Sequence, residues 1–582
     1  MPKNVDSKLA IFDFDGTITT KDSFNDFLRY RFGWWKFVTS TMTNVFWIIL
    51  YLMGIVDNRV PKEKILQKLV GKVNKMAWEK ETWQYARDRL PDIIKREALE
   101  RIRWHQKSGH EVVVVSASLG SWIKPWAENN QIKTVLASTL KEKGKYYLPE
   151  IATNIFGNHK VSAFKKLYPN YRDRVIYAYG DHRSDEGILS LAQFSYRKIM
   201  PRVPNDLCAI VTDGLWRKSL SVIRSLGKAN YDVAVLGGTF WTIGHWSRFT
   251  TKRMSAPITQ IVNLVKQSEV RPVIFPMEDA TVSWCSEHRG ELAKYADFLL
   301  PDKEMLKVAA NKGLTMLTAR KLGIPTPKTY FPKNPGELIS LLNNLAHQQV
   351  VIKPIEGNGS KGLVYLKPGI EINWIDHWQK YGKLIVQERI GSGGEAYGVS
   401  LLYDQKGKCR AQFSHKRLQQ YPNTGGPSTD RISIHYKHLE SMSQKLLEHL
   451  NWRGVAMVEW KTDPLTHVPH LLEINPRFWG SLELAVRAHV NFPLLYAKAA
   501  KGEMLPPAPK YQDGIRCRWL IPGDILRYLT QEAHESLWEF CRGIPKLCEE
   551  WDRQDLRGAI ATIVCTGVLA LNPKYWKYVR RG

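Results

Sequence analysis

Cysteine is scarce in this sequence of 582 residues, and none occurs in the first 207 residues. The seven cysteines stand at positions 208, 285, 409, 517, 541, 548 and 565, an odd number without any CxxC pair. A disulfide framework or a structural zinc site needs paired or closely spaced cysteines. The sequence therefore argues against both and predicts a protein of a reducing compartment, the cytoplasm.

A secretory leader and a clear membrane span are also missing from the pattern. The first residues, MPKNVDSKLAIF, contain no basic segment followed by an apolar run. The longest apolar tract, 34–56, is diluted by Ser, Thr, Asn and Lys36, and only 45–56 is continuously apolar. We expect a buried helix there, with a helix in the membrane interface as the alternative and a span as the least favoured. A core helix is likewise expected at 559–571.

Negative charge is in deficit: 84 Lys and Arg against 56 Asp and Glu give a formal net charge of +28. Such an excess predicts an anionic partner, which is a nucleotide or phosphorylated substrate, anionic lipid or nucleic acid. The basic residues are spread along the chain, so a solvated surface is the alternative explanation, and peripheral membrane contact stays open. Nucleic acid is the least favoured partner, because the sequence has neither a recognisable nucleic-acid module nor a KxDG ligase signature.

The order of strand and helix patterns predicts several domains, as does the length at roughly 150 residues per domain. Residues 1–203 alternate apolar strands with helical stretches, which is typical of a parallel α/β sheet. The pattern restarts after MPRVPND as an α/β unit over 204–300. Mixed strands and helices follow over 301–510, and residues 511–582 are mostly helical in pattern. The fold class is therefore α/β multidomain.

Polar side chains follow several predicted strands of the first region. The strand LAIFDF leads into Asp13-Phe-Asp15-Gly-Thr, and both carboxylates face one side because strand residues alternate. The ends of open α/β sheets bind ligands. Four further residues come into register there: Ser116, Lys160, Asp181 and Asp185. A nucleophile, an acid or base, magnesium-directed carboxylates, a cation and a hydroxyl are typical of a phosphatase.

At these four motifs, residues 8–203 resemble the haloacid dehalogenase superfamily in its phosphoserine phosphatase-like branch. The resemblance implies that Asp13 is the nucleophile and that Asp15 is the general acid and then the base. It implies Mg²⁺ held by Asp13, the Asp15 carbonyl and Asp181, with Asp185 in support. Ser116 and Lys160 would bind the phosphoryl group, with Lys165 as the competitor of Lys160.

The resemblance also implies a Rossmann-like domain with a helical cap at about 20–105, which sets the choice of substrate. One departure is His182, where the family often has serine. Asp22 is the one cap acid that can be placed, and an acid there meets a substrate amino group in the resembling phosphatases. An aminated phosphomonoester is therefore one interpretation, and Asp22 as a helix N-cap is the other.

The third region has a different inventory. In VVIKPIEGNGSKG, a strand delivers Lys353 and a loop with three glycines follows, at Gly357, Gly359 and Gly362. Glycines let backbone amides approach phosphates, but the loop does not match GxxxxGK[ST], so a P-loop fold is not supported. Further along, AMVEW and LLEINPR carry oxygen ligands suited to Mg²⁺ on a nucleoside triphosphate, followed by an arginine for the transferred phosphate: Glu459, Glu473, Asn475 and Arg477.

Together these residues resemble the ATP-grasp superfamily, of the carboxylate-amine ligase type, over about 207–510. The resemblance implies an α/β domain at 204–300 preceding an α+β ATP-grasp domain, with Lys312 and Lys353 as nucleotide lysines and Glu459, Glu473 and Asn475 as metal ligands. It further assigns the adenine hinge, the ribose contact and an active-site loop near phosphate or carboxylate: Gln387 to Ile390, including Glu388; Glu395; and Lys416 with Arg417.

The two resemblances predict a bifunctional enzyme that uses Mg²⁺ and ATP. Family chemistry converts a carboxylate to an acyl phosphate, from which an amine displaces phosphate, while the phosphatase acts on a phosphomonoester. Fusion in one chain suggests consecutive steps of a biosynthetic pathway. The alternatives are a nucleic-acid end-processing protein and a membrane-surface binding protein with decayed sites.

Overall fold

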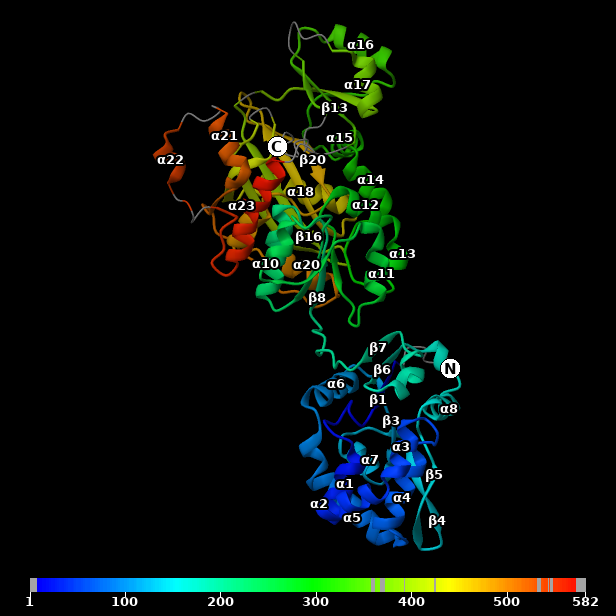
Figure 1. Ribbon diagram of the computed structural model, residues 1–582. Helices are drawn as coiled ribbons and strands as arrows, with labels where there is room; N and C mark the ends of the chain where they lie inside the picture. Colours follow the sequence, from blue (N-terminus) through cyan, green and yellow to red (C-terminus); the bar gives the residue numbers. More distant parts are fainter. Residues whose placement is uncertain are drawn as a thin grey trace. The chain divides into compact units, whose positions relative to one another are not determined.

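The computed structural model describes residues 8–356, 362–366, 372–391, 393–422, 425–530, 535–542, 544 and 548–571. The chain divides into two compact units, Met1–Pro204 and Asn205–Gly582, which we call unit 1 and unit 2. Both units mix helices and strands (Figure 1), which confirms the α/β multidomain class. The finer domain boundaries at 203, 300 and 510 stay predictions.

Unit 1 is built on a sheet of seven strands in the order β2-β5-β4-β3-β1-β6-β7. The central strand β1 is buried along its whole length and pairs in parallel with β3 and β6. A parallel strand covered on both faces is apolar at every position, as LAIF is. The strands are β1 (Leu9–Asp13), β2 (Val73–Asn74), β3 (Glu111–Leu119), β4 (Thr134–Lys143), β5 (Tyr146–Thr153), β6 (Ile176–Gly180) and β7 (Phe194–Arg197).

Helices α1 to α6 lie between β1 and β3 in the chain, where the cap is predicted. Helix α1 begins where the Asp22 carboxylate accepts the Asn25 N–H at 2.8 Å, the N-cap bond that satisfies a free amide of the first turn. The helices of unit 1 are α1 (Ser23–Phe32), α2 (Trp34–Thr43), α3 (Val45–Leu52), α4 (Arg59–Leu69), α5 (Lys75–Asp88), α6 (Arg96–Lys107), α7 (Gly120–Asn129), α8 (Asn158–Leu167) and α9 (Glu186–Leu189).

The apolar tract 34–56 is not a buried helix, and that prediction is wrong. It forms two short helices, α2 and α3, that break at Asn44. Helix α3 buries none of its residues, and α2 buries only Phe37 and Ser40. Only one side of each short helix can pack on α4, so a sequence that is apolar on all sides leaves the rest exposed. Within the described parts of the chain, no helix is both long and apolar enough for a membrane crossing.

The described residues of unit 2 form three sheets. A parallel sheet has the order β10-β9-β8-β11, a small antiparallel sheet the order β12-β15-β13-β14, and a large antiparallel sheet the order β20-β19-β16-β17-β18-β21. The strands of the first two are β8 (Cys208–Val211), β9 (Asp232–Leu236), β10 (Thr250–Met254), β11 (Val273–Phe275), β12 (Thr329–Tyr330), β13 (Val350–Pro354), β14 (Val364–Tyr365) and β15 (Leu384–Glu388). Those of the large sheet are β16 (Ala396–Tyr403), β17 (Cys409–Gln420), β18 (Ser428–Ile434), β19 (Gly454–Thr462), β20 (Pro469–Asn475) and β21 (Arg516–Arg518).

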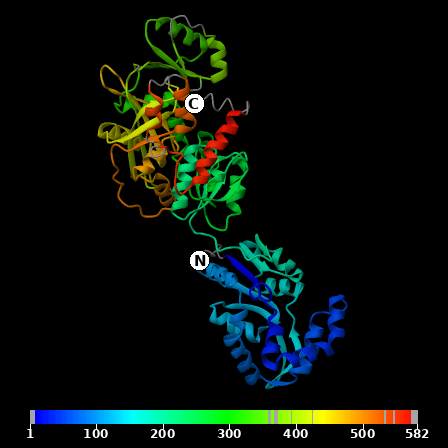
Figure 2. The same ribbon diagram turned by 60° about the vertical axis from the view of Figure 1, so that its left-hand side comes forward.

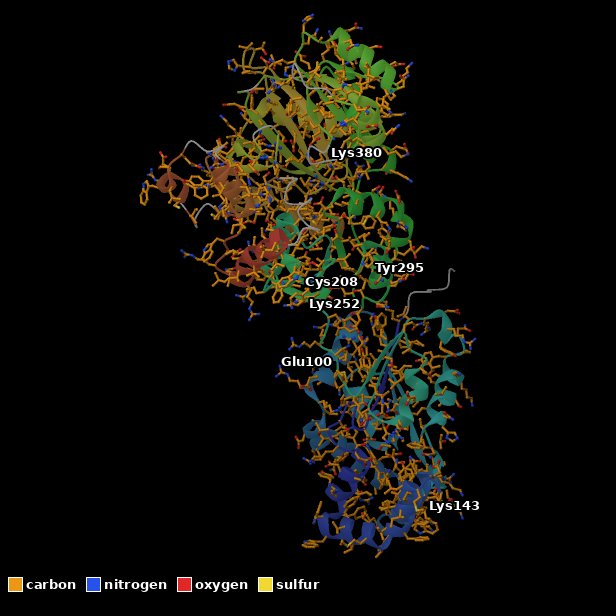
Figure 3. The ribbon with its side chains drawn as sticks, turned by 45° about the horizontal axis from the view of Figure 1, so that its top comes forward. Glu100, Lys143, Cys208, Lys252, Tyr295 and Lys380 are labelled. Carbon is orange, nitrogen blue, oxygen red and sulfur yellow. The ribbon has the colours of Figure 1, made fainter. Side chains whose placement is uncertain are left out.

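Helices accompany each of these sheets. Helices α16 and α17 pack on the small sheet, and together they form a lobe (Figure 1). The helices of unit 2 are α10 (Arg217–Lys228), α11 (Ile261–Lys266), α12 (Asp279–Glu287), α13 (Arg289–Leu292), α14 (Lys303–Ala310), α15 (Lys312–Lys321), α16 (Pro335–Asn344), α17 (Trp374–Tyr381), α18 (Lys437–His449), α19 (Leu482–Arg487), α20 (Phe492–Ala500), α21 (Ile525–Leu529), α22 (Leu537–Cys541) and α23 (Leu556–Leu571). All seven cysteines lie in the described residues and are free, beginning with Cys208 of β8 (Figure 3).

The C-terminal segment is helical, as predicted, but it also completes the large sheet, since β21 pairs antiparallel with β18. Helix α23 is a core helix on one side only. In Figure 2, α23 (red) lies beside the blue-green elements near the start of unit 2. Its Ala561 and Cys565 pack with Leu220 of α10, while Ile560 and Ile563 stay exposed. The prediction of a core helix at 559–571 is therefore correct only for the side that packs on α10.

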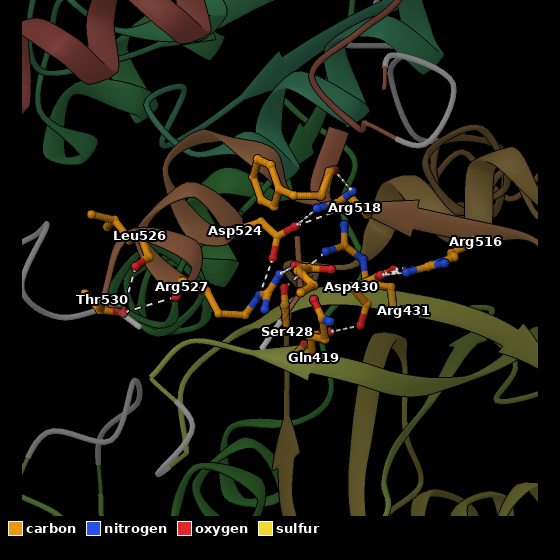
Figure 4. A network of polar contacts seen from close by, with 12 residues as sticks. Gln419, Ser428, Asp430, Arg431, Arg516, Arg518, Asp524, Leu526, Arg527 and Thr530 are labelled. Atoms are coloured by element: carbon orange, nitrogen blue, oxygen red, sulfur yellow. Dashed lines mark hydrogen bonds and ion pairs between the residues drawn. The ribbon is translucent and has the colours of Figure 1, made fainter. Parts of the chain in front are cut away.

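A buried ion cluster ties this segment to the large sheet (Figure 4). The Asp524 carboxylate, fully buried, accepts from Arg518 Nε at 2.8 Å and from Arg527 Nε at 2.6 Å. Both guanidinium groups are only 4% exposed. Removing one partner of such a cluster leaves buried charge without compensation.

We expect Asp524→Asn to lower the free energy of unfolding of unit 2 by about 3–5 kcal/mol, because buried Arg518 loses its counter-charge and Arg527 keeps only its ion pair with Glu535. Urea unfolding of the full chain, followed by hydrogen exchange of the β18 and β21 amides, measures this. The matched variant Asp232→Asn changes an exposed carboxylate at the start of β9, and it should stay within about 0.5 kcal/mol of wild type. Equal stability of the two variants would contradict the argument.

Candidate active sites

The predicted phosphatase residues meet at one edge of the unit 1 sheet. Asp13 is the last residue of β1, Ser116 lies in β3 and Asp181 directly follows β6. One carboxylate oxygen from each of Asp13, Asp181 and Asp185 lies within 4.8 Å of the others. The carboxyl ends of neighbouring parallel strands bring these residues together, as the sequence predicts.

Lys160 is the cation of this cluster. From the first turn of α8, its buried Nζ lies 2.5 Å from Asp13 Oδ1 and 2.6 Å from Asp185 Oδ1. Lys165, its competitor, instead places its ammonium 5.7 Å from the ring centroid of Tyr171. The geometry therefore favours Lys160 as the phosphoryl-binding lysine.

The electrostatics of the cluster fit a divalent cation. The pKa of Asp13 is raised to about 7, because burial and the nearby Asp185 together outweigh the opposing effect of Lys160. Burial and then Asp185 also raise the pKa of Asp181. The carboxylates thus carry more negative charge than Lys160 offsets, and oxygen ligands at this spacing suit Mg²⁺. Asp13 and Asp181, with the Asp15 carbonyl, would hold the ion.

Asp15 and Asp22 face a cap lysine that the sequence interpretation missed. Asp15 Oδ1 accepts the backbone N–H of Ser23 at 2.7 Å, so the start of α1 orients the proposed acid. Lys62 of α4 donates to the Ala117 carbonyl at 2.9 Å and interacts electrostatically with Asp22 and Asp15. Asp22 therefore has a cationic neighbour within the protein besides its N-cap role. This weakens the interpretation that it awaits a substrate amine, and no strand-end pattern in the sequence marks Lys62.

Gly16 is required by its place beside the metal carboxylates. Its φ of +79° is disfavoured for other residues, and a Cβ there would lie 2.1 Å from Asp181 Oδ2. We expect Gly16→Ala to displace Asp181 and to lower phosphatase kcat by about 100-fold, since a shift of about 1 Å at a site has effects of that size. The rate at saturating Mg²⁺ measures this.

Gly109→Ala is the matched control for this variant. Gly109 also has positive φ, +72°, but a Cβ there meets nothing within 4 Å. It therefore carries the backbone strain without the steric clash. If both variants lose activity equally, the contact with Asp181 is not the cause.

The predicted ATP-site residues of unit 2 gather on β19 and β20. These strands pair antiparallel with Glu459 opposite Glu473. Asn475 Nδ2 donates to Glu459 Oε1 at 3.1 Å, and Arg417 Nη2 lies 2.5 Å from Glu459 Oε2. Burial raises the pKa of Glu459, with Glu473 adding to the shift and Arg417 opposing it. Two facing carboxylates and an amide oxygen fit a magnesium site.

Two lysines complete this cluster from the other side. Lys312, at the start of α15, has its Nζ 3.5 Å from Glu473 Oε2. The pKa of Lys353 on β13 is lowered to about 8, because burial and the nearby Lys312 outweigh the opposing effect of Glu473. Burial alone would raise the pKa of Glu473, but Lys312, Lys353 and Arg477 bring it below its ordinary value. Cations beside a metal-directed carboxylate suit the phosphates of a nucleotide.

The predicted hinge residues of the nucleotide site have other contacts. The Gln387 side chain is buried and donates to Thr329 Oγ1 at 2.8 Å, and Glu388 is exposed at the end of β15. Ile390 is buried, and its carbonyl accepts from Lys461 Nζ at 3.1 Å. Since these side chains have partners within the protein or lie in the core, a base-binding role would fall to the backbone of Gln387 to Ile390.

Glu395 and Lys416, predicted to contact ribose and phosphate, form an ion pair with each other. Tyr397 also donates to Glu395. Gly362 has a φ of +70°, and a Cβ there would lie 2.8 Å from Tyr381, so packing against α17 explains this glycine. Gly357 and Gly359 lie outside the described residues.

The parallel sheet of unit 2 contributes residues that the sequence interpretation did not name. Arg477 Nε lies 3.0 Å from Asp279 Oδ2 at the start of α12. Lys218 of α10 lies 2.7 Å from Glu278 Oε1, and burial lowers the pKa of Lys218 to about 8. Glu278 and Asp279 closely follow β11, so the strand-end rule used for Asp13 would have found them.

Comparison with known protein families assigns both units. Residues 10–190 match the family model of haloacid dehalogenase-like hydrolases. Residues 413–521 match the model described as ATP-grasp in the biosynthetic pathway with Ter operon. The chain therefore carries a haloacid dehalogenase-like hydrolase domain and an ATP-grasp domain, and it is an enzyme. These matches confirm both resemblances at the level of the superfamily.

Individual proteins match each part. Protein CicA of Caulobacter vibrioides is 27% identical over 188 residues, which are 32% of this chain and 82% of that protein. N5-carboxyaminoimidazole synthetase from Staphylococcus aureus, complexed with ADP, aligns at 14% identity and a TM-score of 0.43, covering 53% of this chain and 80% of that one. Biotin carboxylase from Campylobacter jejuni aligns at 13% identity and a TM-score of 0.44, covering 53% and 74%.

Proposed function

We propose that unit 1 is a Mg²⁺-dependent phosphomonoester phosphatase and that unit 2 is an ATP-dependent carboxylate-amine ligase that works through an acyl phosphate. The observation that carries the first half is the meeting of Asp13, Lys160, Asp181 and Asp185 at one sheet edge. The second half rests on the facing Glu459 and Glu473 with their lysines. The free cysteines suit a reducing compartment such as the cytoplasm.

In the phosphatase, an Asp13 oxygen attacks the phosphorus atom and the ester oxygen leaves. Asp15, held by the Ser23 amide, gives the leaving oxygen its proton. It then takes a proton from the water that attacks the aspartyl-phosphate, which releases phosphate and restores Asp13. Ser116 and Lys160 bind phosphoryl oxygens, and Mg²⁺ held by Asp13, Asp181 and the Asp15 carbonyl would supply further positive charge for the transferred group.

In the ligase, Lys312 and Lys353 bind nucleotide phosphates beside Glu459, Glu473 and Asn475, which would hold Mg²⁺. The substrate carboxylate attacks the γ-phosphorus of ATP, giving an acyl phosphate and ADP. An amine then attacks the acyl carbon and phosphate leaves, which forms the amide. Arg477 pairs with Asp279 and lies near Lys218. We therefore assign the carboxylate substrate, which accepts the phosphoryl group, to the edge of the parallel sheet.

Two assays on the purified full chain test this proposal. The first measures phosphate release from a panel of phosphomonoesters, with Mg²⁺ and with EDTA. The second incubates ATP with pools of carboxylates and amines and identifies products by mass spectrometry. We expect Mg²⁺-dependent activity in both assays and none with EDTA. Consecutive steps would appear as a ligation product whose precursor or successor is a phosphatase substrate. Activity that EDTA does not affect would contradict the metal assignments.

A further inference from the structure

Unit 1 exposes a patch of large apolar side chains on its cap. The patch consists of Trp35, Met42, Phe46, Ile49, Leu52 and Ile55, which are 78%, 69%, 60%, 48%, 75% and 62% exposed. We call it the apolar cap face. Single exposed apolar residues are ordinary, but a set of this size within one short segment marks an interaction site.

Helix periodicity places these side chains together. Phe46, Ile49 and Leu52 recur every three residues and line one side of α3. Trp35 and Met42 are seven residues apart on α2, away from the buried Phe37. Both helices contact α4 on their other side. The apolar cap face thus extends over two adjoining helices, α2 and α3, which both pack on α4.

Basic residues flank the apolar cap face along the chain, and some of them lie beside it. The segment 29–72 contains eight lysines and arginines and two acidic residues. Lys36 is exposed on α2, Lys64 places its ammonium 5.5 Å from the Trp47 ring centroid, and Lys68 donates to Thr43 at 2.7 Å. Apolar and aromatic side chains bordered by lysine are the composition of helices that lie in a membrane interface, where anionic headgroups attract the basic residues. A second copy of this face would instead bring like charges together.

The elements that bear or support this face contact elements of the phosphatase site. The Tyr51 ring of α3 lies 6.4 Å from the ring of Phe156, shortly before α8 and its Lys160. Lys62 of the supporting helix α4 interacts with Asp15 and Asp22. A molecule whose apolar part lies against α3 therefore has its polar end within reach of these elements.

We propose that the apolar cap face docks unit 1 on an anionic lipid surface, where the site takes an amphiphilic phosphomonoester. The phosphate of such a substrate enters the Asp13 site while its apolar part stays in the lipid. Asp13 displaces the alcohol, which takes a proton from Asp15 and stays in the membrane, and water then hydrolyses the aspartyl-phosphate and releases phosphate. This inference rests on the proposed phosphatase function for its substrate and stands independently of it for docking.

Vesicle flotation of the full chain tests the docking. The vesicles are phosphatidylcholine alone or with phosphatidylserine, at low and at high salt. We expect flotation with the anionic vesicles and weaker flotation at high salt. The test variant is Phe46→Ser/Ile49→Ser/Leu52→Ser, and we expect it to reduce binding at least about tenfold. The matched control is Ile560→Ser/Ile563→Ser/Val564→Ser on the exposed side of α23, which should bind as wild type does.

Two substrates separate this inference from the proposed function. Hydrolysis of vesicle-borne phosphatidate should fall at least about tenfold in the test variant, while hydrolysis of soluble p-nitrophenyl phosphate stays within about twofold of wild type. If the wild type hydrolyses neither substrate, the proposed phosphatase function is rejected, and the flotation result alone decides whether the apolar cap face docks on lipid. Flotation of the test variant equal to that of wild type overturns the proposal. The proposal is also overturned if the wild type does not bind lipid but forms a dimer by light scattering, and the test variant does not form this dimer.

Discussion

Asp13→Asn abolishes phosphomonoester hydrolysis and leaves ATP-dependent ligation unchanged. We expect a fall in phosphatase kcat on the order of 10³ or more, because an amide keeps the shape of the carboxylate but cannot attack phosphorus. The substitution also removes a negative charge from the cluster with Lys160, Asp181 and Asp185, so Mg²⁺ affinity should fall as well. Phosphate release measures the first effect, and isothermal titration with Mg²⁺ measures the second.

The control for Asp13→Asn is Asp88→Asn, which changes a surface carboxylate paired with Arg87. It should keep both activities, because exposed ion pairs contribute little. A folded Asp13→Asn protein that also lost ligation would show that the two units do not act separately. Phosphatase activity that survived in Asp13→Asn would remove this residue from the nucleophile role.

Glu473→Gln stops the second reaction and spares the first. Glu473 faces Glu459 across the β19–β20 pair and lies 3.5 Å from Lys312. Glutamine has the same size, so the strand register should persist, but one charge of the proposed metal site is lost. We expect carboxylate-dependent ADP release to fall by a factor on the order of 10² or more. A coupled ADP assay measures this, with phosphatase turnover in the same preparation as the internal control.

The matched variant for Glu473→Gln is Glu304→Gln, an exposed carboxylate of α14 whose side chain is 70% exposed. It should release ADP at the wild-type rate. Ligation at a near wild-type rate in Glu473→Gln would reject the assignment of this cluster to the ATP site. If circular dichroism shows a general loss of secondary structure in Glu473→Gln, the variant has misfolded, because Lys312 and Lys353 then face no carboxylate at this position.

The sequence by itself determined that the carboxylates proposed for the two sites come together. Asp13 and Asp181 follow apolar strands, and neighbouring parallel strands end at one edge of a sheet, so their meeting follows from pattern alone. Glu473 and Asn475 alternate on one strand and share a face for the same reason. These are local rules of chain geometry, which hold whatever packs against the strands. The α/β class follows from the same patterns.

Only the tertiary structure decided which residues surround those carboxylates and which surfaces stay open. Lys160 and Lys165 lie on the same helix, α8. Only the packing of α8 near the end of β1 decides that Lys160, and not Lys165, contacts Asp13. The contact of Arg477 with Asp279 spans 198 positions. The exposure of Phe46 in the tract 34–56 depends on which helix covers α3, because hydrophobicity favours burial only where a partner surface exists. Long-range packing of this kind leaves no periodic mark in the sequence.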